Sequence, residues 1–130
     1  MTLPMETVKS FYEALARGDA PAALGLLTPD MDWSVVAGWP YKPTGRGPQA
    51  VAQGVLMPVL EEWRDYKLHG SDMFEAPGGK VVSVGVMTGV HATTGKPLEA
   101  AYVHIWETAD GRISRMRQTV DTARVLEARS

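Results

Sequence analysis

The feature that most constrains the fold is the segment from Leu98 to Leu126, where apolar and polar residues alternate on both sides of Asp110-Gly111. Asp-Gly is a dipeptide favoured in tight hairpin turns. A period of two is the pattern of a β-strand whose two faces meet different surroundings. The segment therefore predicts two long strands joined by a tight turn.

Side chains that carry chemistry gather on this predicted hairpin. Those that share one face of each arm are Tyr102, His104 and Trp106 on the first and Arg115, Arg117, Thr119 and Asp121 on the second. With the turn at residues 110 and 111, the register places His104 opposite Arg117 and Asp121 near Tyr102. We therefore expect one patch of sheet to hold an imidazole, a guanidinium, a carboxylate, a phenol and an indole.

Composition narrows the class of protein. The 130 residues fit one domain, 1–130, and 45% apolar and 22% charged residues are ordinary for a soluble globular protein. A net charge of −2 argues against a broad surface for nucleic acid or anionic membrane. With no signal peptide and no apolar run of about 20 residues, we expect a cytoplasmic protein.

Several site chemistries are excluded. There is no cysteine, which removes disulfides, thiolate nucleophiles and Cys-based zinc sites. The three histidines, His69, His91 and His104, fall on three predicted strands without metal-ligand spacing, so we expect no metal. Nucleotide-binding glycine loops and the serine nucleophile elbow are also missing, so we expect no cofactor.

The first half of the chain predicts helices. Apolar residues at helical spacing follow Pro4 and stop at Gly18, and Asp19 can cap a second short helix. A third amphipathic helix spans Pro48 to about Trp63, and Pro58 inside it predicts a kink near Gly54.

The second half predicts strands. A short strand runs from Met31 to Val36, and four longer ones in an antiparallel meander follow at Tyr66–Glu75, Lys80–Thr93, Leu98–Glu107 and Arg112 to about Asp121. The remaining TARVLEARS adds one helical turn.

Two features indicate a cavity. Gly85 and Gly89 share one face of the strand at Lys80–Thr93, which predicts bending or close approach of another group. A bent sheet packed on helices leaves a cavity at one end. The loop aromatics Trp39 and Tyr41 either fold back over the core edge or line the mouth of that cavity.

The order of these elements resembles the cone-shaped α+β fold of the NTF2-like superfamily, in particular its SnoaL-like, ketosteroid isomerase-related branch. The matching pieces are FYEALARGDAPAALGLLTPDMDW, the G-R-G-x-x-A-V entry to the third helix, and HIWETADGRISRMRQTVDTARV. The resemblance covers essentially the whole chain. It implies a curved antiparallel sheet wrapped on three N-terminal helices.

The resemblance also implies roles for particular residues. In SnoaL-like polyketide cyclases a carboxylate near the end of the last strand is the base, and Asp121 aligns with it. Gln118 stands where those cyclases often have a histidine, so His104 on the neighbouring strand could bind the substrate oxygen instead. Epoxide hydrolase relatives use an Asp-Arg-Asp arrangement, of which Arg117 and Asp121 offer one half and Asp32 a distant candidate for the other.

The predicted catalytic residues are therefore Asp121, His104 and Arg117. Desolvation would raise the pKa of the Asp121 carboxyl toward a useful range, whereas a neighbouring Arg117 would lower it. The two groups could equally form a structural ion pair. Aromatic, amide and thioether side chains suited to an apolar ring-shaped ligand are Tyr12, Trp33, Trp39, Tyr41, Met87, Tyr102, Trp106 and Gln118.

Three functional hypotheses remain open. The first is a cofactor-independent isomerase or aldol-type cyclase acting on a small, apolar, carbonyl-bearing molecule, and the second is a non-catalytic ligand-binding or dimerisation domain. The third is water addition to an epoxide. The resemblance also implies a homodimer formed through the open face of the sheet, for which Val82, Val84, Val86, Val103 and Ile105 could supply an apolar patch.

Overall fold

A computed structural model describes residues 3–130 of the chain. It begins with helices α1 (Pro4–Ala16) and α2 (Ala20–Leu24). Pro4 occupies the first turn of α1, where the missing N–H removes no hydrogen bond within the helix. Asp19 caps α2 by accepting a hydrogen bond of 3.1 Å from the Ala22 N–H.

The third helical segment is irregular as well as amphipathic. It comprises α3 (Pro48–Val51), a π-helical turn η1 (Ala52–Leu56) and α4 (Met57–Glu62). Pro58 cannot donate to the carbonyl four residues earlier, at Gly54, so the widened turn lies where the sequence predicted a kink. At Gly54 an added Cβ would lie 2.6 Å from the Pro43 Cα, so the preceding loop packs against this turn.

Five strands of the described part of the chain form one sheet in the order β1-β5-β4-β3-β2. Their bounds are β1 (Leu27–Val35), β2 (Trp63–Ala76), β3 (Lys80–His91), β4 (Pro97–Ala109) and β5 (Arg112–Val120). Strands β2 to β5 form the predicted antiparallel meander, and β1 adds to β5 in parallel. The predicted α+β class and curved sheet are confirmed.

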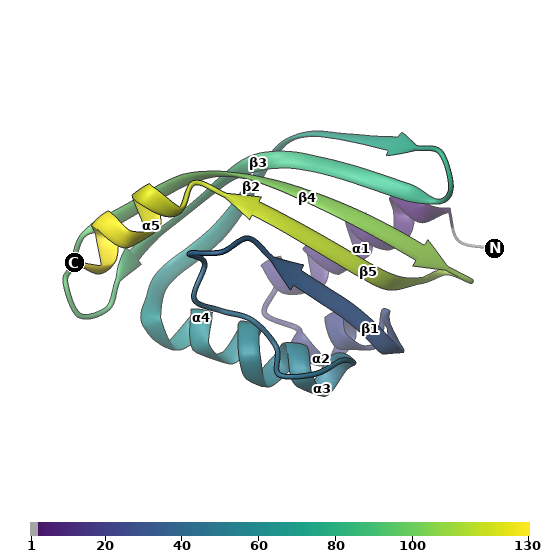
Figure 1. Ribbon diagram of the computed structural model, residues 1–130, viewed down its shortest axis with the longest axis horizontal. Coiled ribbons are helices and arrows are strands. Elements are labelled where there is room, and N and C mark those ends of the chain that lie inside the picture. Colours follow the sequence, from purple (N-terminus) through teal and green to yellow (C-terminus); the bar gives the residue numbers. More distant parts are fainter. Residues whose placement is uncertain (1–2) are drawn as a thin grey trace.

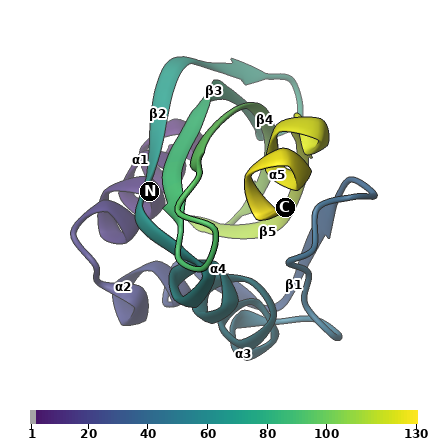
Figure 2. The same ribbon diagram turned by 90° about the vertical axis from the view of Figure 1, so that its left-hand side faces the viewer.

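The sheet curls around the helices (Figures 1 and 2). Helix α1 lies against its concave side and contacts β2, β3, β4 and β5. Phe11 on α1 is fully buried, and its ring centroid lies 5.3 Å from that of Trp106 on β4. The core therefore sits between α1 and the inner face of the sheet.

The C-terminal helix α5 (Thr122–Arg129) is longer than the single turn predicted. Strand β5 pairs with β4 only as far as Tyr102, so the beginning of β4 lacks a strand on that side. Helix α5 packs beside this part of β4 (Figure 1), with Val125 and Ala128 buried. It thereby covers an edge that would otherwise expose unpaired backbone groups.

The register of the hairpin differs from the predicted one by one residue. Ala109 pairs with Arg112, but Glu107 pairs with Arg115, which leaves Ser114 as an extra residue in a β-bulge. Beyond the bulge, His104 lies opposite Gln118 and not opposite Arg117. Tyr102 likewise pairs with Val120 and not with Thr119, the partner in the predicted register.

Within residues 3–130, no helix combines the length and the apolarity needed to cross a membrane.

Candidate active site

A row of polar side chains crosses the inner face of the sheet. Ser83 on β3 pairs with His104 on β4, which pairs with Gln118 on β5. All three are at least 93% buried, with exposed fractions of 2%, 4% and 7%. Tyr12 reaches this row from α1, the helix that covers the inner face.

Short hydrogen bonds join these residues. The Tyr12 hydroxyl lies 2.5 Å from Ser83 Oγ and 2.6 Å from His104 Nδ1. On the other side of the imidazole, His104 Nε2 lies 2.7 Å from Gln118 Oε1. Trp106 Nε1 lies 3.2 Å from the Tyr12 oxygen and 3.3 Å from Ser83 Oγ.

The chemistry of these groups assigns a direction to each bond. Gln118 Oε1 can only accept, so His104 Nε2 carries the ring proton and donates it. His104 Nδ1 is then an acceptor and takes the Tyr12 proton, while the Tyr12 oxygen accepts from Ser83 and Trp106. In this arrangement Tyr12 and His104 are both uncharged.

Burial keeps both groups neutral. Desolvation lowers the pKa of His104 from 6.5 to about 4, although the hydrogen bond with Gln118 acts in the opposite direction. Desolvation also raises the pKa of Tyr12 far above its usual value, against the smaller effect of the Ser83 hydrogen bond. At neutral pH the row therefore offers an uncharged imidazole and an uncharged phenol in contact.

Aromatic rings enclose the imidazole. The Tyr102 ring stacks on it at 4.3 Å and 28°, and the Tyr12 ring stacks at 5.9 Å and 15°. Gly85 makes room for Tyr102, since a Cβ at position 85 would lie 2.6 Å from the Tyr102 hydroxyl. This is the close approach that the glycines of β3 predicted.

Trp33 and Met87 complete the inner wall. The Trp33 ring lies 6.0 Å from Trp106 and 6.2 Å from Phe11. Met87 is fully buried, and the Tyr66 hydroxyl donates to its sulfur at 3.7 Å. Trp33 and Met87 were predicted from the sequence as site residues, whereas Tyr66 and Ser83 were not. The only sequence signal for Ser83 was its position as a small polar residue on the glycine-bearing face of β3.

The loop aromatics fold back onto the core. Trp39 and Tyr41 are 5% and 4% exposed, and their ring centroids are 4.8 Å apart. The Tyr41 hydroxyl accepts a hydrogen bond of 2.7 Å from Trp63 Nε1. Both rings thus cover the core edge, the first of the two roles that the sequence allowed.

Asp121 and Arg117 lie apart from the row. Asp121 is exposed and caps α5, accepting a hydrogen bond of 3.4 Å from the Arg124 N–H. Arg117 is exposed on the outer face, because the bulge at Ser114 turns it away from His104. The structure brings together Tyr12, His104 and Gln118 instead.

No Asp-Arg-Asp arrangement forms around Arg117 in the described part of the chain. Asp32 instead forms long ion pairs with Arg46 at 3.9 Å and Arg115 at 3.8 Å. Nor do residues 3–130 contain a group of three or more His, Asp or Glu side chains placed to hold a metal ion.

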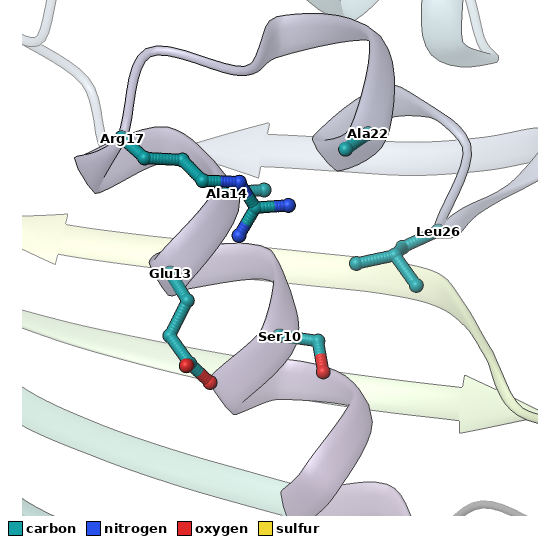
Figure 3. Close-up of a pocket in the computed structure, with 6 residues that line it drawn as sticks. All are labelled: Ser10, Glu13, Ala14, Arg17, Ala22 and Leu26. Carbon is teal, nitrogen blue, oxygen red and sulfur yellow. The ribbon is translucent and has the colours of Figure 1, made fainter.

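Two hollows on the molecule lie away from the polar row. One, of about 240 Å³, lies between α1 and α2 and is lined by Ser10, Glu13, Ala14, Arg17, Ala22 and Leu26 (Figure 3). The other, of about 320 Å³, lies beside α5 and includes Leu98, Arg124 and Ala128. Two aromatic residues beside the row, Tyr12 and Trp33, are only partly buried.

Comparison with solved structures gives matches over nearly the whole chain. An NTF2-like protein from Burkholderia thailandensis E264 is 29% identical, with a TM-score of 0.93 and coverage of 100% of this chain and 99% of that one. An NTF2-like protein of unknown function from Burkholderia pseudomallei K96243 is 27% identical, with a TM-score of 0.85 and 98% coverage of both chains.

A third similar structure is IdmH from Streptomyces antibioticus, a candidate polyketide cyclase. It is 21% identical, with a TM-score of 0.81 and 98% coverage of both chains, and at that identity the likeness shows the fold alone. No curated protein matches the chain. The profile of the SnoaL-like domain matches residues 8–116, so the chain belongs to the SnoaL-like domain family, within the NTF2-like fold.

Proposed function

We propose that this protein is a cofactor-independent isomerase or aldol-type cyclase for a small, apolar, carbonyl-bearing molecule, with proton transfer through Tyr12 and His104. The observation that supports it is the neutral imidazole at 2.6 Å from the Tyr12 hydroxyl, inside an aromatic interior. A phenol and an imidazole in contact can move a proton without separating charge over a long distance.

The proposed step breaks the C–H bond beside the ligand carbonyl. That proton goes to the Tyr12 oxygen as the Tyr12 proton passes to His104 Nδ1, and the bonding electrons become an enolate. The imidazolium that forms still donates through Nε2 to Gln118 Oε1. In isomerisation the proton returns to a different carbon. In ring closure the enolate carbon bonds to a second carbonyl carbon, and the new alkoxide takes the proton.

The low pKa of His104 narrows the substrate. A base with a pKa of about 4 removes only protons that are already acidic. Carbons flanked by two carbonyl groups carry such protons. The proposal therefore favours 1,3-dicarbonyl compounds with an aromatic or otherwise apolar end, which suits walls made by Tyr102, Trp106 and Trp33.

Deuterium uptake by ethyl benzoylacetate tests this proposal. In D₂O the wild-type protein should accelerate the loss of the NMR signal of the C–H between its two carbonyls. Tyr12→Phe and His104→Asn should lower the rate by about 10²–10⁴-fold, the usual contribution of a positioned acid or base. His69→Asn, which alters an exposed histidine on β2, is the control and should keep the wild-type rate.

The same assay compares two assignments of the base. If Asp121 is the base, as the family resemblance implied, Asp121→Asn abolishes exchange and Tyr12→Phe does not. If Tyr12 and His104 carry the proton, the outcome reverses. A wild-type protein that binds the ester without accelerating exchange would contradict both and favour a non-catalytic ligand-binding domain.

We also propose that two copies associate through the outer face of the sheet. Phe74, Val82 and Ile105 form one row across β2, β3 and β4, beside the pair Val84 and Val103. Phe74 is 47% exposed, and the other four are only partly covered, which leaves an apolar band toward solvent.

Sedimentation tests the dimer. The wild-type protein should sediment as a dimer, and Val103→Lys should make it a monomer by placing a charge in the band. Leu60→Lys is a matched control, because Leu60 is 66% exposed on α4, away from the sheet face. A monomeric wild-type protein would refute the proposal.

A further inference from the structure

Four buried polar atoms in the described residues lack a hydrogen-bond partner, and two of them are donors on the neighbouring strands β5 and β1. Gln118 Nε2 and Trp33 Nε1 are both buried atoms without a partner in the described residues. An unpaired buried donor costs stability, so each such group in a native protein requires an explanation. Gln118 itself is only 7% exposed, so bulk water cannot be that explanation.

The two donors come from neighbouring positions on one face. In the parallel pairing of β1 with β5, Trp33 is opposite Met116 and Val35 is opposite Gln118, which makes Trp33 and Gln118 diagonal neighbours. Met116 and Gln118 are both buried on the inner face, and the Trp33 ring packs there against Trp106. Neighbouring strands lie about 4.8 Å apart and each residue advances about 3.3 Å, so diagonal neighbours two residues apart are separated by about 8 Å, within reach of an indole.

Neighbouring contacts fix the donors in place. The Gln118 amide cannot rotate freely, because its oxygen accepts from His104 at 2.7 Å. The Trp33 ring lies near both Phe11 and Trp106. Asp32, the residue beside Trp33, supplies no acceptor, since its carboxylate pairs with Arg46 and Arg115. Two fixed donors on one face thus lack an acceptor that the protein could provide.

We propose that Gln118 Nε2–H and Trp33 Nε1–H bind a carbonyl oxygen of the ligand. This deepens the proposed function, on which it rests for the identity of the ligand, and it assigns different tasks to the two sides of the row. Tyr12 and His104 transfer the proton, while Gln118 and Trp33 hold the oxygen on which enolate charge develops.

The same geometry selects against charged ligands. The three arginines of β5, Arg112, Arg115 and Arg117, are all exposed, so none of them balances a carboxylate bound in the interior. Donors without a nearby cation favour an uncharged acceptor oxygen. The ligand is therefore a neutral ketone or ester with an apolar, planar body.

Acetophenone and cumene form a pair of probes of similar size, in which acetophenone has a carbonyl oxygen where cumene has a hydrogen and a methyl group. Neither needs to react, so binding is measured without turnover. The chain has four tryptophans, so its ¹H–¹⁵N spectrum contains four indole signals. The signal that disappears in Trp33→Phe is that of Trp33.

The wild-type protein should bind acetophenone about tenfold more tightly than cumene. Acetophenone alone should move the Trp33 indole and Gln118 amide signals downfield. Trp33→Phe and Gln118→Met should each reduce the preference to less than about threefold. Trp39→Phe is the control: its indole N–H is also buried and unpartnered, but it lies on the loop after β1, and the preference should persist.

Equal affinities for the two probes, or no shift of either signal at the solubility limit of acetophenone, would overturn this inference. Its failure is distinguishable from that of the proposed function. Wild-type preference for acetophenone with no deuterium exchange removes the catalytic proposal and keeps the carbonyl site. Exchange that depends on Tyr12 without any preference does the opposite.

Discussion

The contact between Gly85 and Tyr102 gives a sharp test of how the inner face is packed. An added Cβ at Gly85 would lie 2.6 Å from the Tyr102 hydroxyl and 2.8 Å from its Cζ, and still closer to the backbone carbonyl of His69. A backbone carbonyl in a sheet cannot move aside cheaply. Gly85→Ala should therefore cost about 1–3 kcal/mol, the usual effect of overpacking.

Gly70 provides a matched control on the adjacent strand. It is the pairing partner of Gly85, and a Cβ there would meet only the Tyr102 hydroxyl, at 4.0 Å. Neither glycine has a positive φ, so alanine is compatible with both backbones. Gly70→Ala should be neutral, or stabilising by about 0.4–1 kcal/mol, because it restricts the unfolded chain.

Urea denaturation followed by circular dichroism measures both variants. The expected difference in unfolding free energy between them is about 1–4 kcal/mol, with Gly85→Ala the less stable. In Gly85→Ala the displaced Tyr102 ring should also lose its stacking on His104, which the His104 NMR signals would report. If the two variants are equally stable, the close packing of Tyr102 under β3 is wrong.

Three further predictions concern charge and polarity. The pKa of His104 is about 4 in the folded protein and 6.5 in the unfolded chain, so unfolding takes up a proton between these pH values. The free energy of unfolding should therefore fall by about 3 kcal/mol as the pH drops from 6.5 to 4. The fall should be smaller in His104→Asn. Burial acts to raise the pKa of Glu62, but hydrogen bonds from Arg129, Tyr41 and His91 outweigh it and lower the pKa. Wild-type stability should therefore fall as acid protonates folded Glu62, and Glu62→Gln should flatten this dependence in urea titrations at several pH values. The triple variant Tyr12→Phe, His104→Leu, Gln118→Leu should be at least as stable as Tyr12→Phe alone, because the single substitution leaves His104 Nδ1 without a hydrogen-bond partner. A much less stable triple variant would indicate a structural role for the row.

The sequence predicted the elements well because their signals are local. The alternation in Leu98–Leu126 marked both arms of the hairpin, and Pro58 marked the helix irregularity that became η1. Asp19 was identified as a cap from its position alone, and the structure has it in that role. The parallel pairing of β1 with β5 was not predicted, because no local pattern specifies which distant strand an edge strand joins.

The register error at the hairpin had a readable cause. Ile113 and Met116 are both fully buried although they are three residues apart, which a strand of period two does not allow. The extra residue, Ser114, forms a bulge that resets the alternation. Asp121 likewise carried a second signal that the family resemblance obscured, since an Asp directly before a helical sequence is a typical N-cap.

The bulge also determines which residues can act together. Without Ser114, the guanidinium of Arg117 would face His104, and its charge would oppose formation of an imidazolium. With the bulge, position 118 faces the imidazole, and its amide fixes which ring nitrogen holds the proton. The polar row on the inner face then consists of hydrogen-bonding groups that are uncharged at neutral pH. Stability alone does not require such a row, because apolar side chains fill a core at lower cost in free energy. Its retention in an aromatic interior is what the proposed proton transfer explains.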